Sequence, residues 1–200
     1  MLSLEATEET LRRLDSCDVC LIGPGLGRGN GVASVVRHIL RSTHLPVVLD
    51  ADGINALMGH IDVLDARQGL ATVLTPHDGE FARLTGAMPG PDRLRTARDF
   101  AGAHGCILVL KGHRTITAFP DGRAFVNTTG NPGMAKGGSG DVLAGVILSL
   151  LGQGLAPEQA VPAAVLYHGL AGDLAAEERG EYGMTPMDLV EKLPAALRHF

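Results

Sequence analysis

The sequence predicts an α/β protein with three layers, in which helices cover both faces of a mostly parallel central sheet. Short, continuous apolar runs such as Val47–Leu49 and Ile107–Leu110 are typical of strands that are buried on both faces. These runs alternate with segments of helical period, as in a chain of βαβ units. Loops rich in Gly, Asp and other polar residues follow the strands, at the edge where open α/β sheets bind ligands.

Each element has a local signal. The apolar runs predict strands at Val19–Ile22, Val47–Leu49, Thr72–Leu74 and Ile107–Leu110, and Pro120–Gly122 predicts a hairpin between Thr115–Phe119 and Arg123–Asn127. Periodicity predicts helices at Glu5–Leu14, after a capping Asn30, around Ile54–Met58, and at Glu80–Leu84, Asp92–Ala103, Val142–Leu151 and Ala160–Glu178. Thr185-Pro186 opens a last helix, in which Asp188 closes a capping box.

Composition excludes several classes of function. A net charge of −5 and an aromatic content of 4% leave neither the basic stripe nor the stacking residues that nucleic-acid binding requires. No run approaches the roughly 20 apolar residues of a membrane helix, so we expect no membrane association. Three cysteines, an odd number, favour reduced thiols and a cytoplasmic protein. We interpret Cys17 and Cys20 as buried structural thiols rather than as a redox pair.

The strongest motif is the glycine-rich run Gly137, Gly138, Ser139, Gly140, which precedes Asp141 and an apolar helix. Glycines let a ligand approach the backbone, and a helix N-terminus adds positive partial charge. This run therefore predicts an anion hole for a phosphoryl group in transfer, with Asp141 at its entrance. The alternative, an Asp that only favours the helix dipole, does not need three surrounding glycines.

Polar loops follow the other predicted strands. Gly23–Gly27 matches neither G-x-G-x-x-G nor a P-loop, so we interpret it either as a tight turn or as close packing on a flat ligand. Asp50 and Asp52 can be turn residues, or they can bind a hydroxyl or a metal.

The two remaining loops carry titratable side chains. His77 can hydrogen-bond a ligand, and no metal is expected to bind directly, although Glu80 can reach a magnesium ion through water. Lys111–Thr115 is a basic loop that suits nucleotide contact or is simply a solvated turn.

Four stretches of the chain together resemble the ADP-dependent NAD(P)H-hydrate dehydratase family. The longest is the stretch Asn131–Gly145, with the letters NPGMAKGGSGDVLAG. The others, in the same order as in the family, are Leu49–Leu57, Leu74–His77 with Gly79-Glu80, and Val109–Gly112. The resemblance covers essentially the whole chain and implies a ribokinase-like fold for residues 1–200.

The resemblance also implies a reaction and its site. The family restores NADH or NADPH from the (6S) hydrate with ADP and Mg²⁺, giving AMP and phosphate. It implies hydrate binding by Gly27, His77 and Asp141. It implies nucleotide binding by Lys111, Gly112, His113, Arg114, Thr115 and Gly140. We interpret Asp141 as the catalytic base.

Two other expectations follow from the resemblance. The family normally carries a further segment before the part equivalent to Met1, so we expect this domain to be incomplete at its N-terminus. The family also suggests a homotetramer. Two other functions remain open at this point: a small-alcohol or vitamin-precursor kinase of the ribokinase-like superfamily, and a non-catalytic nucleotide-binding paralogue.

Overall fold

The computed structural model describes residues 4–199, with side chains from residue 7 to residue 198. Within them, six strands form one sheet in the order β1-β2-β3-β4-β5-β6. The strands are β1 (Cys20–Ile22), β2 (Val47–Leu49), β3 (Thr72–Leu74), β4 (Ile107–Leu110), β5 (Ile116–Ala118) and β6 (Ala124–Val126). The first four are parallel, and β5 and β6 add an antiparallel hairpin. The predicted mostly parallel sheet is confirmed.

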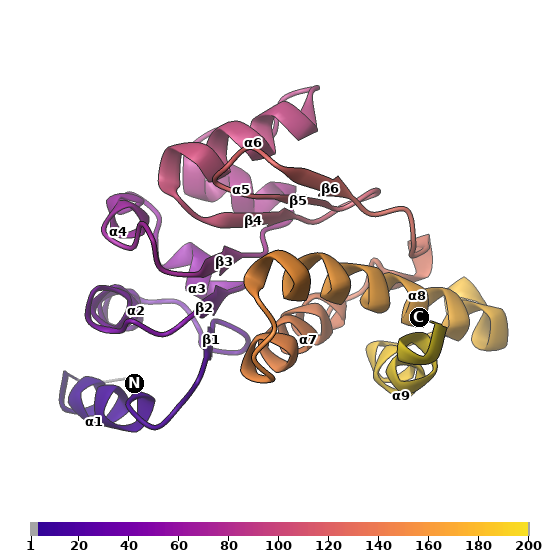
Figure 1. Cartoon of the computed structure of the whole chain (residues 1–200), viewed down its shortest axis with the longest axis horizontal. Coiled ribbons are helices and arrows are strands. Elements are labelled where there is room, and N and C mark those ends of the chain that lie inside the picture. The colour runs from indigo at the N-terminus through magenta and orange to yellow at the C-terminus, as the bar shows by residue number, and fades with distance from the viewer. Residues whose placement is uncertain (1–3, 200) are drawn as a thin grey trace.

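Helices cover both faces of this sheet, which confirms the three-layer α/β/α architecture (Figure 1). One face carries α1 (Leu4–Leu14), α2 (Asn30–Ser42), α3 (Asp52–Asn55), α4 (Asp62–Asp65), α5 (Asp78–Thr85) and α6 (Arg93–His104). The other carries α7 (Ser139–Gly152) and α8 (Pro157–Gly183), and α9 (Pro186–Ala196) packs against both. No helix in residues 4–199 is long and apolar enough to cross a bilayer.

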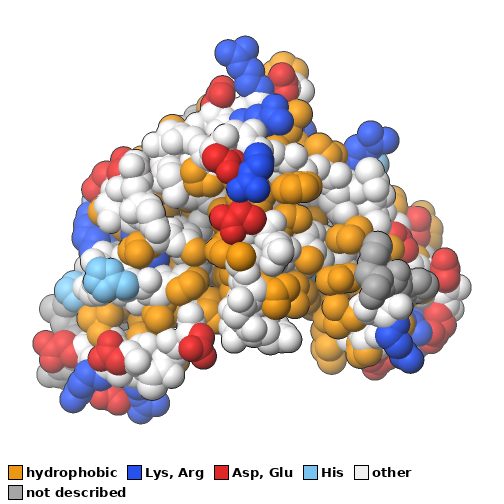
Figure 2. Space-filling view, in the orientation of Figure 1, with side chains coloured by type: hydrophobic (Ala, Val, Ile, Leu, Met, Phe, Trp, Pro, Cys, Tyr) orange, Lys and Arg blue, Asp and Glu red, His pale blue; other side chains and the backbone are white. Residues whose placement is uncertain are grey.

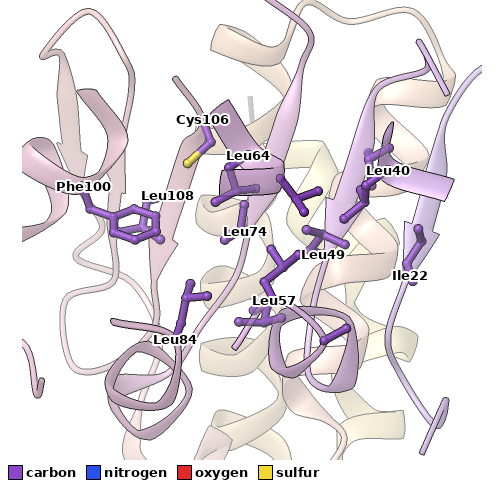
Figure 3. Close-up of a cluster of buried hydrophobic side chains, with 14 of the residues drawn as sticks. Ile22, Leu40, Leu49, Leu57, Leu64, Leu74, Leu84, Phe100, Cys106 and Leu108 are labelled. Carbon is purple, nitrogen blue, oxygen red and sulfur yellow. The ribbon is translucent and has the colours of Figure 1, made fainter. Parts of the chain in front are cut away.

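The alternation of strand side chains builds the two cores. Leu49 and Leu108 belong to the core under α2–α6, whereas their neighbours Val48 and Val109 belong to the core under α7 and α8. Figure 3 shows the first of these cores, where Leu49 and Leu74 lie among helix side chains such as Leu64. Because successive strand residues point to opposite faces, continuous apolar runs are what a sheet covered on both sides requires.

Some element boundaries differ from the predicted ones. Gly29, not Asn30, is the N-cap of α2, so Asn30 is the first helical residue and caps nothing with its side chain. The helix expected around Ile54–Met58 is the single turn α3, and α4 had no sequence signal. Most importantly, α7 begins at Ser139 rather than Val142, which places Asp141 inside its first turn.

The thiols also differ from the prediction. Cys17 is exposed and Cys20 half-buried, so the interpretation of this pair as buried thiols is wrong for Cys17. Cys106, in contrast, is buried, and burial raises the pKa of its thiol to about 12. All three are free cysteines.

The surface over α7–α9 is more apolar than the rest of the view in Figure 2, where hydrophobic side chains gather toward the lower right. An open groove of about 320 Å³ lies there between α7 and α9. Its walls include Val146, Leu150, Val190, Leu193 and Leu197.

The buried arginine Arg67 ties the end of α2 to β3. Its guanidinium donates to the carbonyls of Leu40, Thr43 and Leu45 at 2.7–2.8 Å and to the hydroxyl of Thr72 at 3.0 Å. The last carbonyls of a helix lack intrahelical donors, so Arg67 satisfies acceptors that would otherwise be buried unpaired.

We predict that Arg67→Met lowers the free energy of unfolding by about 3 kcal/mol or more, because several buried carbonyls lose their donor. Urea unfolding followed by circular dichroism measures the change. Arg95→Met is the control, since the Arg95 side chain is 79% exposed, and it should change stability by less than about 0.5 kcal/mol. Equal stabilities of the two variants would contradict the role given to Arg67.

Candidate active site

Side chains from the ends of three neighbouring strands meet around Asp50. The Asp50 carboxylate is buried, and its Oδ1 accepts from Thr75 Oγ1 at 2.6 Å and from Lys111 Nζ at 2.8 Å. Glu80 Oε2 lies 3.6 Å from the same ammonium. The structure therefore brings together the loops after β2, β3 and β4, as expected for the carboxyl edge of a parallel sheet.

Burial changes the interpretation of Asp50. Its Oδ1 accepts from two protein donors and its side chain is 2% exposed, so Asp50 serves the protein's own network through this oxygen. Lys111, which is partly exposed, is the member of this cluster that reaches the surface. Asp50 holds its ammonium in place.

Asp52 serves a different network from Asp50, two residues away. It accepts from the amide of Gly27 at 3.1 Å, from Arg28 Nε at 2.9 Å and from Asn55 Nδ2 at 3.0 Å. Burial alone would raise the pKa of Asp52, but these hydrogen bonds and the charge of Arg28 hold the pKa below its usual value. An ionised Asp52 therefore fixes the loop that carries Gly27.

The intervening Ala51 adopts φ 47° and ψ −116°, a conformation that residues with a Cβ rarely take. Such strain costs on the order of 1–3 kcal/mol and is tolerated where the surroundings determine it. Here it lets Asp50 and Asp52 serve two separate networks.

The turns after β1 and β2 touch backbone to backbone. A Cβ on Gly23 would lie 1.7 Å from the carbonyl oxygen of Asp50, and a Cβ on Gly53 would lie 2.2 Å from that of Ile22. Gly23 thus packs on the protein itself, contrary to the flat-ligand interpretation. Gly27 has open space at the Cβ position and remains accessible.

His77 begins α5 through a capping box that the sequence did not predict. Its Nδ1 accepts from the amides of Gly79 and Glu80 at 3.0 and 3.3 Å, and Glu80 Oε2 accepts from the His77 amide at 2.9 Å. With Nδ1 engaged as an acceptor, the neutral ring carries its proton on Nε2. This ring is half exposed and offers a donor to a ligand. Glu80, in contrast, is committed to the box and to Lys111.

The N-terminus of α7 lies beside the Lys111 ammonium. A Cβ on Gly140 would lie 3.1 Å from Lys111 Nζ and 3.9 Å from Asp50 Oδ2, so this position accepts only a glycine without displacement. Gly138 has φ 98°, which glycine adopts readily. The predicted anion hole is thus next to a fixed positive charge.

One amide of the predicted anion hole, that of Ser139, is engaged within the protein. The Ser139 amide donates to the Lys136 carbonyl at 3.3 Å, whereas the amides of Gly140 and Asp141 have no acceptor within residues 4–199. The Asp141 side chain is exposed in the first turn of α7 and makes no hydrogen bond or ion pair with that part of the chain.

The Lys111–Thr115 loop joins β4 to β5. The Thr115 hydroxyl donates to the Gly112 carbonyl at 3.1 Å and closes the loop on itself, and Arg93 donates to the Lys111 carbonyl at 3.2 Å. His113 and Arg114 are exposed at its tip. These two side chains are free to contact a ligand but are not positioned by the fold.

His168, which lies in the interior of α8, contacts the first residue of α7. Its Nε2 lies 2.9 Å from the Ser139 carbonyl oxygen. Burial lowers the pKa of the imidazole to about 4. The hydrogen bond to Ser139 acts to raise this pKa, and the charge of Lys111 lowers it further. The neutral ring thus donates to the first residue of α7. Within the described residues, the buried hydroxyl of Ser139 has no hydrogen-bond partner.

Asp173 has a structural role that the sequence did not reveal. Its carboxylate accepts from the Gly130 amide at 2.8 Å and from Asn131 Nδ2 at 3.1 Å. It thereby anchors the loop that leads into the glycine-rich run to α8.

Two comparisons of sequence place the chain among known proteins. The family model for NAD(P)H-hydrate dehydratase matches residues 2–195. The bifunctional NAD(P)H-hydrate repair enzyme Nnr of Moorella thermoacetica is 46% identical over 99% of this chain and 38% of its own length. The ADP-dependent (S)-NAD(P)H-hydrate dehydratase of Neisseria meningitidis is 39% identical over 87% of this chain and 60% of its own. The chain thus spans less than two thirds of the length of each of these relatives.

Solved structures show the same likeness. The ADP/ATP-dependent NAD(P)H-hydrate dehydratase of Bacillus subtilis, co-crystallised with ATP and Mg²⁺ and soaked with CoA, has a TM-score of 0.79 and 33% identity over 94% of this chain and 71% of that one. A ribokinase-like superfamily protein of Enterococcus faecalis has a TM-score of 0.82 and 30% identity over 98% of this chain and 68% of that one. The predicted ribokinase-like fold is confirmed.

We predict that stability falls as the pH drops from about 6.5 towards 4 through His168. In this window the unfolded histidine binds a proton that the folded, buried ring does not, because its folded pKa is about 4. At pH 4 this effect lowers the free energy of unfolding by on the order of 3 kcal/mol. Well above pH 6.5 both states hold a neutral His168, and the effect disappears. Urea unfolding at several pH values measures it.

His168→Gln should keep a donor to the Ser139 carbonyl and abolish this part of the pH dependence. His38→Gln, at an exposed position of α2, is the control and should leave the slope unchanged. If His168→Gln shows the same slope as the unchanged protein, the buried neutral state of His168 is refuted.

Proposed function

Because this chain belongs to the NAD(P)H-hydrate dehydratase family, we propose that it restores NADH or NADPH from the (6S) hydrate. ADP is the co-substrate, and AMP and phosphate are the other products. The names of the Neisseria and Bacillus relatives support both the reaction and the nucleotide.

One observation carries the proposal: the glycine-bounded start of α7 lies against the Lys111 ammonium, and the exposed Asp141 stands in its first turn. Amides at a helix N-terminus and a fixed cation stabilise the charge of a phosphoryl group in transfer. A carboxylate beside them is placed to accept a proton from an attacking hydroxyl. Phosphoryl transfer needs these parts together.

The nucleotide is proposed to bind between Lys111–Thr115 and Gly140. Lys111 and the amides of Gly140 and Asp141 face its terminal phosphate. His113 and Arg114, exposed at the loop tip, contact the remainder beside Gly112. The hydrate is proposed to lie against Gly27, His77 and Asp141, with the Nε2–H of His77 as a donor.

The reaction is proposed to proceed in two steps. Asp141 accepts the proton of the hydroxyl on C6 of the hydrate, and this oxygen attacks the terminal phosphorus of ADP, which releases AMP. The C6–O bond of the phosphorylated hydrate then breaks with the help of the ring nitrogen lone pair. Phosphate leaves, and loss of a proton from the neighbouring carbon restores the dihydronicotinamide. ADP and the hydrate have then become AMP, phosphate and NAD(P)H.

Magnesium has no ready-made protein site in the part of the chain that the structure describes. No three acidic, histidine or cysteine side chains converge there, and the carboxylate of Glu80 is held by the His77 amide and Lys111. When bound, the ion accompanies the phosphates of the nucleotide and neutralises their charge. The steps above depend only on protein groups.

The homotetramer that the family resemblance suggests stays a prediction.

We predict that the protein, mixed with Mg²⁺, ADP and NADPH hydrate, regains the near-ultraviolet absorbance of reduced nicotinamide and releases inorganic phosphate. The two alternatives give different results. A small-alcohol kinase would keep its phosphorylated product, and a non-catalytic paralogue would show no turnover. If ATP supports turnover far better than ADP, the proposed co-substrate is wrong.

We predict that Asp141→Asn lowers kcat by about 10²–10⁴-fold, because the amide keeps the size of the side chain but cannot accept the proton. Affinity for ADP should change little, since the Lys111–Thr115 loop and the α7 amides remain. Steady-state kinetics and calorimetry with ADP measure the two effects.

The control is Glu158→Gln in the first turn of α8. Glu158 is also exposed at a helix N-terminus, so this variant reproduces the loss of helix-dipole stabilisation without touching the site. It should keep normal kcat. Asp141→Asn activity above about a tenth of the unchanged enzyme would rule out the general-base role.

A further inference from the structure

An open cavity of about 610 Å³ lies beside Asp52, between the loop after β1, the start of α2, the turn α3 and helix α5. Gly27, Asn30, Arg37, Asp52, His60 and Arg83 are among the residues that line it. Its volume falls in the range of small-molecule sites. The reaction described above makes no use of Arg37 or Arg83.

The cavity is positively charged. Arg28, Arg37 and Arg83 line it, and Asp52 is the one carboxylate among its lining residues. The charge of Asp52 is already matched by Arg28 and by the Gly27 amide. Arg37 and Arg83 therefore present two cations to the cavity without a carboxylate of their own within residues 4–199.

Both of these guanidinium groups are held in position. Arg37 donates one N–H to the Ala56 carbonyl at 2.8 Å, and Arg83 donates its Nε–H to Asn55 Oδ1 at 2.9 Å. Each side chain is half-buried and keeps further N–H groups. Fixed guanidinium forks match the geometry of phosphate oxygens, and their ordering cost has already been met in the folded protein.

The N-terminus of α2 adds to the same field. This helix has 13 residues, its N-cap Gly29 provides no side-chain cap, and its first turn contains no acidic residue. Gly29, Asn30 and Val32 from this turn line the cavity. A helix start without its own acceptor, facing two arginines, favours an anion.

The cavity is continuous with the proposed hydrate site. Gly27 belongs to both, and a Cβ on Gly79 would lie 3.6 Å from Arg83 Nη1 and 3.2 Å from His77 Nδ1. Arg83 thus reaches the rim on which His77 stands. A ligand whose reacting ring lies between Gly27 and His77 has its remaining groups within reach of the arginines.

We propose that this cavity binds a phosphate group of the hydrated dinucleotide, with Arg37 and Arg83 as its contacts. This subsite rests on the proposed function, because it assumes that the dinucleotide is the substrate. The phosphate has two sources. Both hydrates carry the pyrophosphate bridge, and only the NADPH hydrate carries a phosphate on the adenosine ribose.

The test uses Arg37→Gln and Arg83→Gln in the full chain, with kinetics on both hydrates and calorimetry with NADPH and NADH. Each variant should raise KM for a hydrate by about tenfold or more, since an arginine–phosphate contact is a strong, charge-assisted one. The kcat and the KM for ADP should stay within about twofold, because the groups at α7 are untouched. If KM rises for the NADPH hydrate alone, the arginines contact the ribose phosphate. If KM rises equally for both hydrates, they contact the pyrophosphate.

Arg41→Gln is the matched control, because Arg41 lies one turn further along α2, pairs with Asp62 and is outside the cavity. If a glutamine variant is misfolded by circular dichroism, Arg37→Lys and Arg83→Lys replace it, since each keeps a charge and a donor but loses the fork.

Failures of the subsite and of the proposed function are distinguishable. Normal turnover with unchanged KM for both hydrates in both arginine variants overturns the subsite and leaves the reaction intact. A protein that binds NADPH through these arginines but restores none from the hydrate overturns the reaction and leaves the subsite.

Discussion

The ion pair between the buried carboxylate of Asp50 and the partly exposed Lys111 is the contact on which the site depends. Asp50 follows β2 and Lys111 follows β4, and the hydroxyl of Thr75, which follows β3, donates to the same Asp50 oxygen. A buried carboxylate is costly unless it is paired and hydrogen-bonded, and both conditions are met here. Three strands are thereby held in register at the edge where the ligand loops emerge.

This pair also locates the start of α7. A side chain at position 140 would crowd the Lys111 ammonium, with a Cβ 3.1 Å from Nζ, so glycine lets the helix approach the cluster without displacing this cation. The neutral imidazole of His168 also holds this turn, because it donates to the Ser139 carbonyl. The first turn of α7 is therefore fixed between a cation and a buried donor, which leaves Asp141 exposed in a defined place. Preorganised charges of this kind need no rearrangement at the moment of reaction.

Two regions of positive potential result along one edge of the molecule. The first combines Lys111 with the α7 amides, and the second combines Arg37 and Arg83 with the α2 N-terminus. The strained Ala51 separates them, because it assigns Asp50 to the first region and Asp52 to the second. A substrate and a co-substrate that both carry phosphates suit such a division.

The sequence by itself determined the layers and the ligand edge. Continuous apolar runs such as Val47–Leu49 identify strands covered on both faces, and the loops after four of these strands meet as predicted. The glycines before Asp141 likewise mark the start of a helix, which is where the anion hole is predicted. These features depend on local periodicity and backbone freedom, which neighbouring residues alone decide.

Only the tertiary structure decided which polar side chains face a ligand and which face each other. Asp50 and Asp52 look equivalent in sequence, yet one is buried against Lys111 and the other fixes Gly27. Arg37, Arg83 and His168 carry no motif, because their roles depend on residues from 19 to 29 positions away, such as Ala56, Asn55 and Ser139. A hydrogen bond or ion pair between distant residues is set by how the layers pack. Spacing along the chain therefore does not reveal it.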